Sequence, residues 1–244
     1  MNFLVIYTKY FVNYFAQFKT KPYVIGLTGG IASGKSSIAK RLKDLGAHTI
    51  SCDQLGHLAY KKGTECFRQM VEHFGNGILN KENEIDRKKL GPLVFSNKVG
   101  LKQGKRICLQ LILSLLYLQD HLERLNLMVW PEIRRLYTKE INELKQQNFQ
   151  GVVVLDAAIL LEAGWQEDCA EVWVAIVPKD EAINRIVERD HLTTEQAARR
   201  VESQLSNSDR VTSANVVICS SWEPEVTAAQ VLKAWKFVQE FLEN

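Results

Sequence analysis

The stretch YVIGLTGGIASGKSS, Tyr23 to Ser37, decides the fold. Its first seven residues form a short apolar run that ends in glycine, which is typical of a strand buried on both faces of a parallel sheet. The residues that follow fit the pattern G-x-x-x-x-G-K-[ST], and Ile38, Leu42 and Leu45 then share one face of an expected helix. Strand, glycine-rich turn and helix in this order predict a loop that binds the phosphates of a nucleotide.

The chemistry of this loop explains its residue types. Glycines let backbone N–H groups wrap around phosphates, and the N-terminus of the helix adds the positive end of its dipole. Lys35 is expected to reach the β- and γ-phosphates, and the Ser36 hydroxyl is expected to ligate Mg²⁺. A chance glycine-rich turn is the alternative, which the flanking strand and helix disfavour. The predicted nucleotide-binding residues are Gly29, Gly30, Ile31, Ala32, Ser33, Gly34, Lys35, Ser36 and Ser37.

The rest of the chain alternates between apolar runs and helical patterns. Further strands are expected in AHTISCD (47–53), Val152–Leu155, EVWVAIVP (171–178) and ANVVICS (214–220). Such alternation predicts the α/β class, with a five-stranded parallel sheet, right-handed crossovers and helices on both faces. The chain of 244 residues contains no internal repeat and is long enough for one large domain with subdomains.

Composition limits the partners and the compartment. The apolar content of 46% and the charged content of 24% are typical of a soluble globular protein, and a net charge of +3 does not indicate nucleic acid binding. The five cysteines lack metal-binding spacing and are expected to be reduced, as in a cytoplasmic protein; mitochondrial association is left open. Residues 1–21 lack the features of a signal peptide and are expected to be a leader without fixed structure. No apolar run reaches the roughly 18 residues that span a bilayer, so membrane association is not expected.

Asp53 is a candidate general base. It follows the second expected strand, and ligands of doubly wound sheets gather at the carboxyl ends of the strands. Its carboxylate could accept the proton of an attacking hydroxyl, although an aspartate that only ends a strand or caps a helix is the alternative. A GTPase is disfavoured, because NKVG at Asn97 is not the N-K-x-D of guanine recognition.

A pair of arginines forms a second candidate group. Arg185 and Arg189 lie four residues apart on an expected helix whose N-cap is predicted to be Asp180, so both side chains share a face. Such a pair can close over phosphates as part of a lid. The alternative is a solvated face with Glu181 and Glu188 as ion-pair partners.

Several motifs together resemble one family. YVIGLTGGIASGKSS, CDQLGH, DRKKLGPLVFSN, WPEI, LLEAGW, RIVERD and SQLSNSDR occur in an order that is similar to dephospho-coenzyme A kinases, and most similar to the kinase half of animal bifunctional coenzyme A synthases. The resemblance implies a P-loop kinase domain at residues 22–241, with a helical substrate-binding part at 60–150 and a lid at 180–212. It also implies ATP-dependent phosphorylation of the ribose 3′-hydroxyl of dephospho-coenzyme A, the last step of coenzyme A synthesis.

The same resemblance implies roles for single residues. Lys35 and Ser36 serve ATP and Mg²⁺, Arg189 is the lid arginine that faces the ATP phosphates, and Asp53 is the base. Asp53 and Arg87 also bind the substrate. Asp156 is either an acidic residue near the metal or a strand-end turn former, and both interpretations stay open. The family implies a phosphopantetheine adenylyltransferase as partner, fused or separate.

Four features depart from the family pattern. Ser51 replaces an aspartate, Trp130 replaces a histidine of many members, and Ala158 replaces a proline. The fourth is the block VGLKQGKRICLQLILSLLYLQ, residues 99–119, which has no counterpart; without it, Leu122, Leu125, Val129, Ile133 and Leu136 continue one amphipathic helix.

The origin of the block has two explanations. Valine codons begin with GT, Gln119 can be CAG, and LILSLLYL can be encoded by a pyrimidine-rich tract, so a retained intron or gene-prediction error is the first hypothesis. The second is a membrane-surface or partner-binding helix that uses Lys102, Lys105 and Arg106. The alternatives for function are therefore another small-molecule P-loop kinase, or a protein that binds nucleotide but is catalytically impaired by the block.

Overall fold

The computed structural model describes residues 21–95 and 107–243, with side chains for all of these except 95 and 107–119. It divides into two compact units, which are described separately: unit 1 comprises Met1–Asp53 and Glu140–Asn244, and unit 2 comprises Gln54–Lys139. The predicted leader, apart from Lys21, and residues 99–106 of the atypical block lie outside the described residues.

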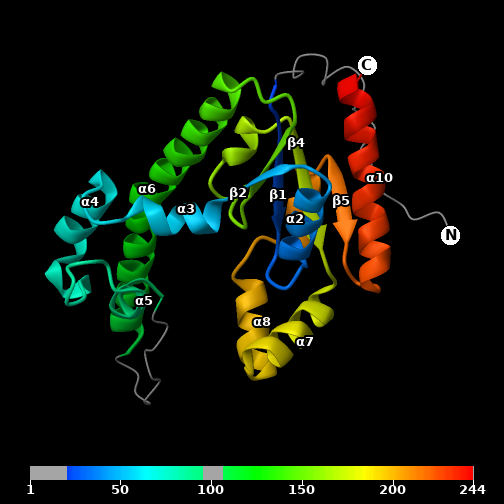
Figure 1. Ribbon diagram of the computed structural model, residues 1–244. Helices are drawn as coiled ribbons and strands as arrows, with labels where there is room; N and C mark the ends of the chain where they lie inside the picture. The colour runs from blue at the N-terminus through cyan, green and yellow to red at the C-terminus, as the bar shows by residue number, and fades with distance from the viewer. Residues whose placement is uncertain (1–20, 96–106, 244) are drawn as a thin grey trace. The chain divides into compact units, whose positions relative to one another are not determined.

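Unit 1 is built on a five-stranded parallel sheet with the order β2-β3-β1-β4-β5 (Figure 1). The strands are β1 (Tyr23–Gly29), β2 (His48–Ser51), β3 (Val152–Asp156), β4 (Glu171–Ile176) and β5 (Val216–Cys219). β1 lies at the centre of the sheet, so the loop that follows it has a neighbouring strand on each side. The predicted parallel sheet is confirmed.

The second strand ends earlier than the sequence pattern suggested. β2 stops at Ser51, and α3 (Cys52–Ala59) begins directly after it, so Asp53 lies in the first turn of a helix. The apolar run TISC continues the β pattern past the true boundary, which explains the difference. Asp53 therefore lies just beyond the end of β2, at the carboxyl edge of the sheet.

Two helices cover one face of this sheet. α2 (Lys35–Asp44) contributes Ile38 and Leu42, and α10 (Pro224–Glu243) contributes Trp235, to a core with alternate residues of the strands. The opposite face is packed closely at Gly26, where an added Cβ would lie 2.7 Å from Leu160 Cδ2 and 2.8 Å from Cys169 Sγ. β1 is thus fixed on both faces, which holds the loop after it in place.

Three shorter helices continue the chain after β4. They are α7 (Lys179–Asp190), α8 (Thr194–Glu202) and α9 (Asn207–Thr212), and Figure 1 shows α7 and α8 near the end of the sheet where the β1–α2 loop lies. Ile183 and Ile186 of α7 and Ala197 of α8 form a small core, with Ile31 of the loop packed against it. The predicted N-cap Asp180 is wrong: Pro178 is the N-cap, and Asp180 lies in the first turn.

Unit 2 is helical. It contains α4 (Glu65–Phe74), η2 (Asn76–Ile78), α5 (Arg87–Phe95) and most of α6 (Ile107–Gln146). Its core contains Cys66, Met70, Ile78, Leu90 and Val94, against which Leu122, Leu125, Met128 and Val129 of α6 pack. These α6 residues follow the predicted three-and-four spacing, although α6 begins at Ile107, inside the atypical block.

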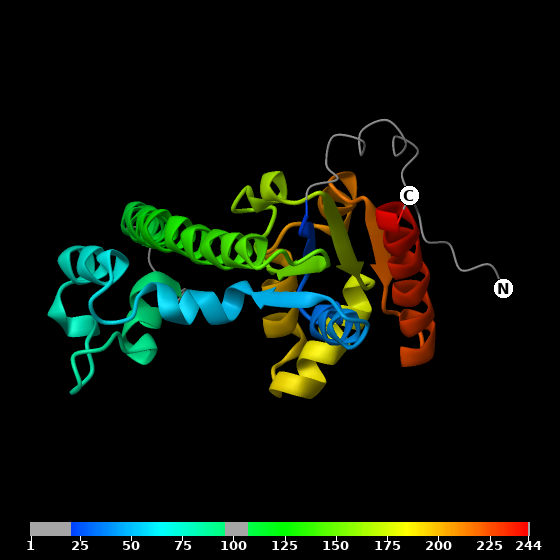
Figure 2. The same ribbon diagram turned by 45° about the horizontal axis from the view of Figure 1, so that its top comes forward.

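Figure 2 shows the same elements after a turn about the horizontal axis, with α6 as one long helix. In the described part of the chain, no helix is long and apolar enough to cross a membrane.

Candidate active site

The β1–α2 loop has the backbone conformation that exposes its N–H groups. Ala32 and Gly34 adopt left-handed conformations, with φ of 60° and 80°. For Ala32 this costs about 1–2 kcal/mol relative to a right-handed residue, so surrounding contacts must hold it. Gly34 is the N-cap of α2 and makes no side-chain cap bond, so the helix N-terminus is directed into the site without a side chain over it.

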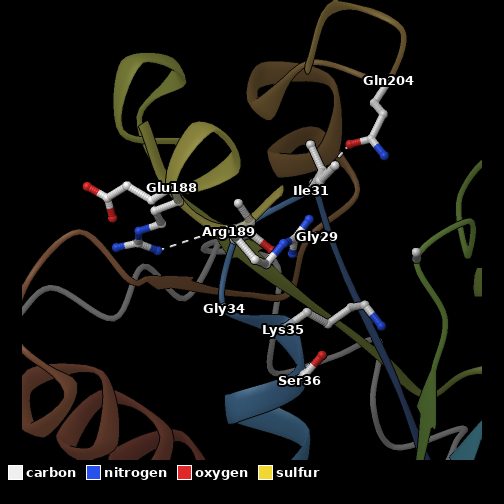
Figure 3. Close-up of a pocket in the computed structure, with 13 residues that line it drawn as sticks. Gly29, Ile31, Gly34, Lys35, Ser36, Glu188, Arg189 and Gln204 are labelled. Carbon is white, nitrogen blue, oxygen red and sulfur yellow. Dashed lines mark hydrogen bonds between the residues drawn. The ribbon is translucent and has the colours of Figure 1, made fainter. Parts of the chain in front are cut away.

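This loop forms one wall of a cavity of about 730 Å³, a typical size for a small-molecule site. The cavity is lined by Gly29–Ser36, Ala158, Arg185, Glu188, Arg189 and Gln204 (Figure 3). Every predicted nucleotide-binding residue except Ser37 lines it; Ser37 is exposed on α2. The residues predicted from the glycine-rich motif are therefore gathered at one cavity.

Lys35 forms an ion pair with Asp156 at the base of the loop. Both side chains are largely buried, with 11% and 16% of their surface exposed. Asp156 ends β3 and is the register partner of Leu27 in β1 and of Ser51, the last residue of β2, so it lies between these two strands. The strand-end position of Asp156 was visible in the sequence, but its pairing with Lys35 was not.

Asp53 belongs to the same acidic neighbourhood. Burial raises the pKa of the Cys52 thiol above its usual range, and the negative charges of Asp156 and Asp53 raise it further. Asp53 follows Ser51, the register partner of Asp156, by two residues, so both carboxylates lie at the carboxyl edge of the sheet. Asp53 itself is exposed, so its carboxylate is accessible to a hydroxyl group. Among the described residues, no group of three or more acidic, histidine or cysteine side chains could hold a metal alone.

The two predicted lid arginines have different environments. The guanidinium of Arg189 donates to Asp190, with Nε–Oδ1 at 2.8 Å, and this hydrogen bond raises the pKa of Arg189. Its side chain is 58% exposed and lines the cavity. The ion-pair alternative holds for Arg185, whose Nε donates to Glu181 at 2.8 Å. The remaining Arg185 hydrogen bonds go to the carbonyls of Ala32 and Ser220 and to the Ser220 hydroxyl, so of the two arginines Arg189 has the more exposed side chain at the cavity.

Gln204 is a site residue that sequence reasoning missed. Its Oε1 accepts a hydrogen bond from the Ile31 N–H at 2.7 Å, which links the end of α8 to the loop (Figure 3). Arg210 of α9, almost fully buried, donates to the Leu205 carbonyl and so fixes the segment that carries Gln204. Gln204 and Arg210 both lie in the quoted motif SQLSNSDR, so the motif marked this segment without indicating the role of either residue.

Arg87 lies in unit 2 within a small polar cluster. Its Nε donates to the Tyr60 hydroxyl at 2.6 Å, and its Nη1 lies 3.0 Å from His57 Nε2. The guanidinium also lies over the Tyr60 ring, 5.5 Å from its centroid. Tyr60 and His57 were not predicted as site residues, although His57 is the last residue of the quoted motif CDQLGH. The substrate-binding role of Arg87 stays a prediction.

Gly29 offers a direct test of the loop geometry. A Cβ at Gly29 would lie 2.6 Å from the backbone oxygen of Ala175, which cannot move away, whereas the nearest atom to a Cβ at Gly30 is 3.6 Å distant. Gly29→Ala is therefore expected to lower the free energy of unfolding by about 1–3 kcal/mol. Gly30→Ala should leave it nearly unchanged. Thermal unfolding of the nucleotide-free protein measures both, and equal midpoints for the two variants would contradict the geometry.

The sheet order and the loop at the end of β1 together define a P-loop kinase. A family model described as Dephospho-CoA kinase matches residues 23–117 and 110–223. The chain therefore belongs to the dephospho-CoA kinase family, and it is a kinase that transfers phosphate from ATP.

Related sequences and solved structures are similar to this chain over most of its length. A dephospho-CoA kinase from Moorella thermoacetica is 32% identical over 220 residues, which cover 90% of this chain and 94% of that protein. A dephospho-CoA kinase from Geobacter sulfurreducens is 34% identical over 212 residues, covering 87% and 96%. The crystal structure of TT1252 from Thermus thermophilus matches with a TM-score of 0.68 at 25% identity, covering 88% of this chain and 96% of that chain. Dephospho-CoA kinase from Campylobacter jejuni matches with a TM-score of 0.54 at 23% identity, with the same coverage.

Proposed function

We propose that this protein phosphorylates the ribose 3′-hydroxyl of dephospho-CoA with ATP, giving CoA and ADP. The observation that supports it most directly is a complete phosphate-binding loop, with Lys35 held at its base, in a chain that belongs to this family. The 3′-oxygen forms a bond to the γ-phosphorus, and the bond from that phosphorus to the β–γ bridging oxygen breaks. ADP leaves with the electron pair, and the hydroxyl proton passes to Asp53.

The proposed roles divide between the loop and the charged side chains. Backbone N–H groups of the loop and Lys35 bind the phosphates, while Arg189 neutralises charge that develops on the transferred group. Ser36 and Asp156 supply a hydroxyl and a carboxylate, which fit Mg²⁺ because this ion is usually held by few protein oxygens together with phosphates and water. When bound, Mg²⁺ would neutralise phosphate charge. Arg87 binds the acceptor in unit 2.

A closer relationship to one branch of the family is also a proposal. The pairing of Trp130 with Pro131 and the motif LLEAGW suggest the kinase half of an animal bifunctional coenzyme A synthase, with an adenylyltransferase fused or separate. The relatives reported above are bacterial kinases of about the length of this chain. A transcript from this locus that encodes both activities in one reading frame would support the fused form.

The atypical block favours a second candidate, a nucleotide-binding protein without turnover. The two family matches meet at residues 110–117, inside the block 99–119. We propose that the block is a retained intron or a gene-prediction error. Abundant transcripts that contain it, with none joined from Lys98 to Asp120, would reject this origin and favour the membrane-surface or partner-binding helix.

A coupled assay for ADP release, with dephospho-CoA as acceptor, tests the function on the full chain and on a version lacking residues 99–119. The deletion removes none of the unit 2 core contacts named above, which begin at Leu122 on α6. We expect the deletion version to turn over. ATP binding without product in both versions would favour the non-catalytic candidate, and turnover only with another hydroxyl acceptor would favour a different small-molecule kinase.

A further inference from the structure

The phosphate-binding loop is held by two residues that lie far from it in the sequence. Arg185 of α7 donates from Nη1 to the Ala32 carbonyl at 3.1 Å. Ser220, just after β5, donates from Oγ to the Ser33 carbonyl at 2.9 Å. Two successive carbonyl groups of the loop are thus bound by side chains from α7 and from the segment after β5.

Arg185 and Ser220 also bind each other. Arg185 Nη1 donates to Ser220 Oγ at 3.0 Å, and Nη2 donates to the Ser220 carbonyl at 2.6 Å. Ser220 Oγ therefore accepts from Arg185 while it donates to Ser33. The loop, the first half of α7 and the end of β5 form one hydrogen-bonded network.

We infer that Arg185 and Ser220 are positioning residues that fix the orientation of the loop peptides and thereby set the affinity for ATP. This inference rests on the proposed function only for the identity of the nucleotide. A peptide unit is planar, so a carbonyl held outward directs the N–H of the next residue inward. Binding the Ser33 carbonyl therefore orients the N–H group of Gly34. Binding the Ala32 carbonyl holds the turn in which the Ser33 N–H donates to the Gly30 carbonyl at 3.1 Å.

The backbone conformation explains why such a support is needed. Ala32 has a Cβ and nevertheless adopts a left-handed conformation, and Gly34 follows two residues later with another. A loop with two such residues can rotate its peptides unless neighbouring groups hold them. Ser220 also contacts Gly34 closely, because a Cβ added there would lie 3.2 Å from Ser220 Cβ.

The same contacts argue against Arg185 as a mobile lid residue. A guanidinium has five N–H donors. In the described structure Nη1 donates to the Ala32 carbonyl and to the Ser220 hydroxyl. Nη2 donates to the Ser220 carbonyl, and Nε donates to the Glu181 carboxylate. At most one donor is left for a phosphate. Arg185 acts through the loop, in contrast to Arg189.

The test compares Ser220→Ala, Arg185→Met and Arg185→Lys in the full chain. Ser220 does not line the cavity, so its hydroxyl can influence ATP only through its two partners, the loop and Arg185. Titration calorimetry with ATP should show about 10-fold weaker binding for Ser220→Ala, which corresponds to the loss of one typical hydrogen bond. Arg185→Met should weaken binding more, and Arg185→Lys nearly as much, because one ammonium group cannot bind both carbonyls.

Lys179→Gln is the matched control, because it removes an exposed α7–α8 ion pair with Glu202 and no hydrogen bond to a loop carbonyl. It should leave ATP affinity unchanged. In variants that turn over, the KM for dephospho-CoA should stay within about twofold, since the acceptor does not bind through these carbonyls. ATP affinity is measured without acceptor, so absence of turnover in the unmodified chain would reject the proposed function alone.

Three results would overturn the inference. Unchanged ATP affinity in Ser220→Ala, with Arg185→Met impaired, would make Arg185 a direct phosphate ligand. Full affinity in Arg185→Lys would show that charge alone matters. Lower melting temperatures with unchanged ATP affinity in both Ser220→Ala and Arg185→Met would make the network merely structural.

Discussion

Asp53→Asn is expected to lower kcat by about 10²–10⁴-fold, the usual contribution of a general base. Asparagine has nearly the same shape but cannot accept the proton of the attacking hydroxyl. Asp53 is exposed at the start of α3 and lies outside the cavity lining. ATP affinity should therefore change little. Steady-state ADP release and calorimetric titration with ATP measure the two quantities separately.

Asp44→Asn is a suitable control for this prediction, because Asp44 is also an exposed helical aspartate but lies at the opposite end of α2 from the loop. It should keep full activity. The alternative role of Asp53, stabilising the first turn of α3, would lower the melting temperature without a large loss of kcat. A fully active Asp53→Asn enzyme would refute the assignment of the base.

Local features of the site could be predicted from the sequence because their signals are local. The strand, glycine-rich turn and helix from Tyr23 to Asp44 occupy consecutive residues, so composition and spacing predict both the fold and the loop. The predicted end of the second strand, at Asp53, and the predicted helix N-cap, Asp180, were wrong, and the reasons are local as well. An apolar run concealed the end of β2, and Pro178, with φ of −53° and ψ of 146°, took the N-cap position of α7.

Long-range partners could not be predicted in this way. Lys35 and Asp156 are 121 residues apart, and Gln204 is 173 residues from Ile31. No periodicity or motif specifies such pairs, because they depend on how the strands order in the sheet. Arg185 illustrates the consequence: its position on α7 suggested a lid, whereas its carbonyl partners make it part of the support for the loop.

Lys35→Met is the second substitution with a large expected effect. The ammonium group is expected to move from Asp156 to the β- and γ-phosphates, where it stabilises negative charge in a site screened from water. Its loss should lower kcat/KM by about 10²–10³-fold, the range observed when one preorganised charge-stabilising donor is removed. Single-turnover phosphoryl transfer at saturating ATP separates the chemical step from weaker binding. An Lys35→Met enzyme with normal turnover would show that the loop backbone alone is sufficient.

Asp156→Asn then separates two roles for the partner of Lys35. If Asp156 also contributes to the Mg²⁺ site, the Mg²⁺ concentration for half-maximal activity should rise about 10-fold or more, as for other groups that support a bound metal. If Asp156 only holds Lys35, that concentration should stay constant while the KM for ATP changes. Because Asp156 ends β3, which lies between β1 and β2 in the sheet, we expect the first result. A constant Mg²⁺ requirement would contradict this role and leave Ser36 as the proposed protein ligand of the metal.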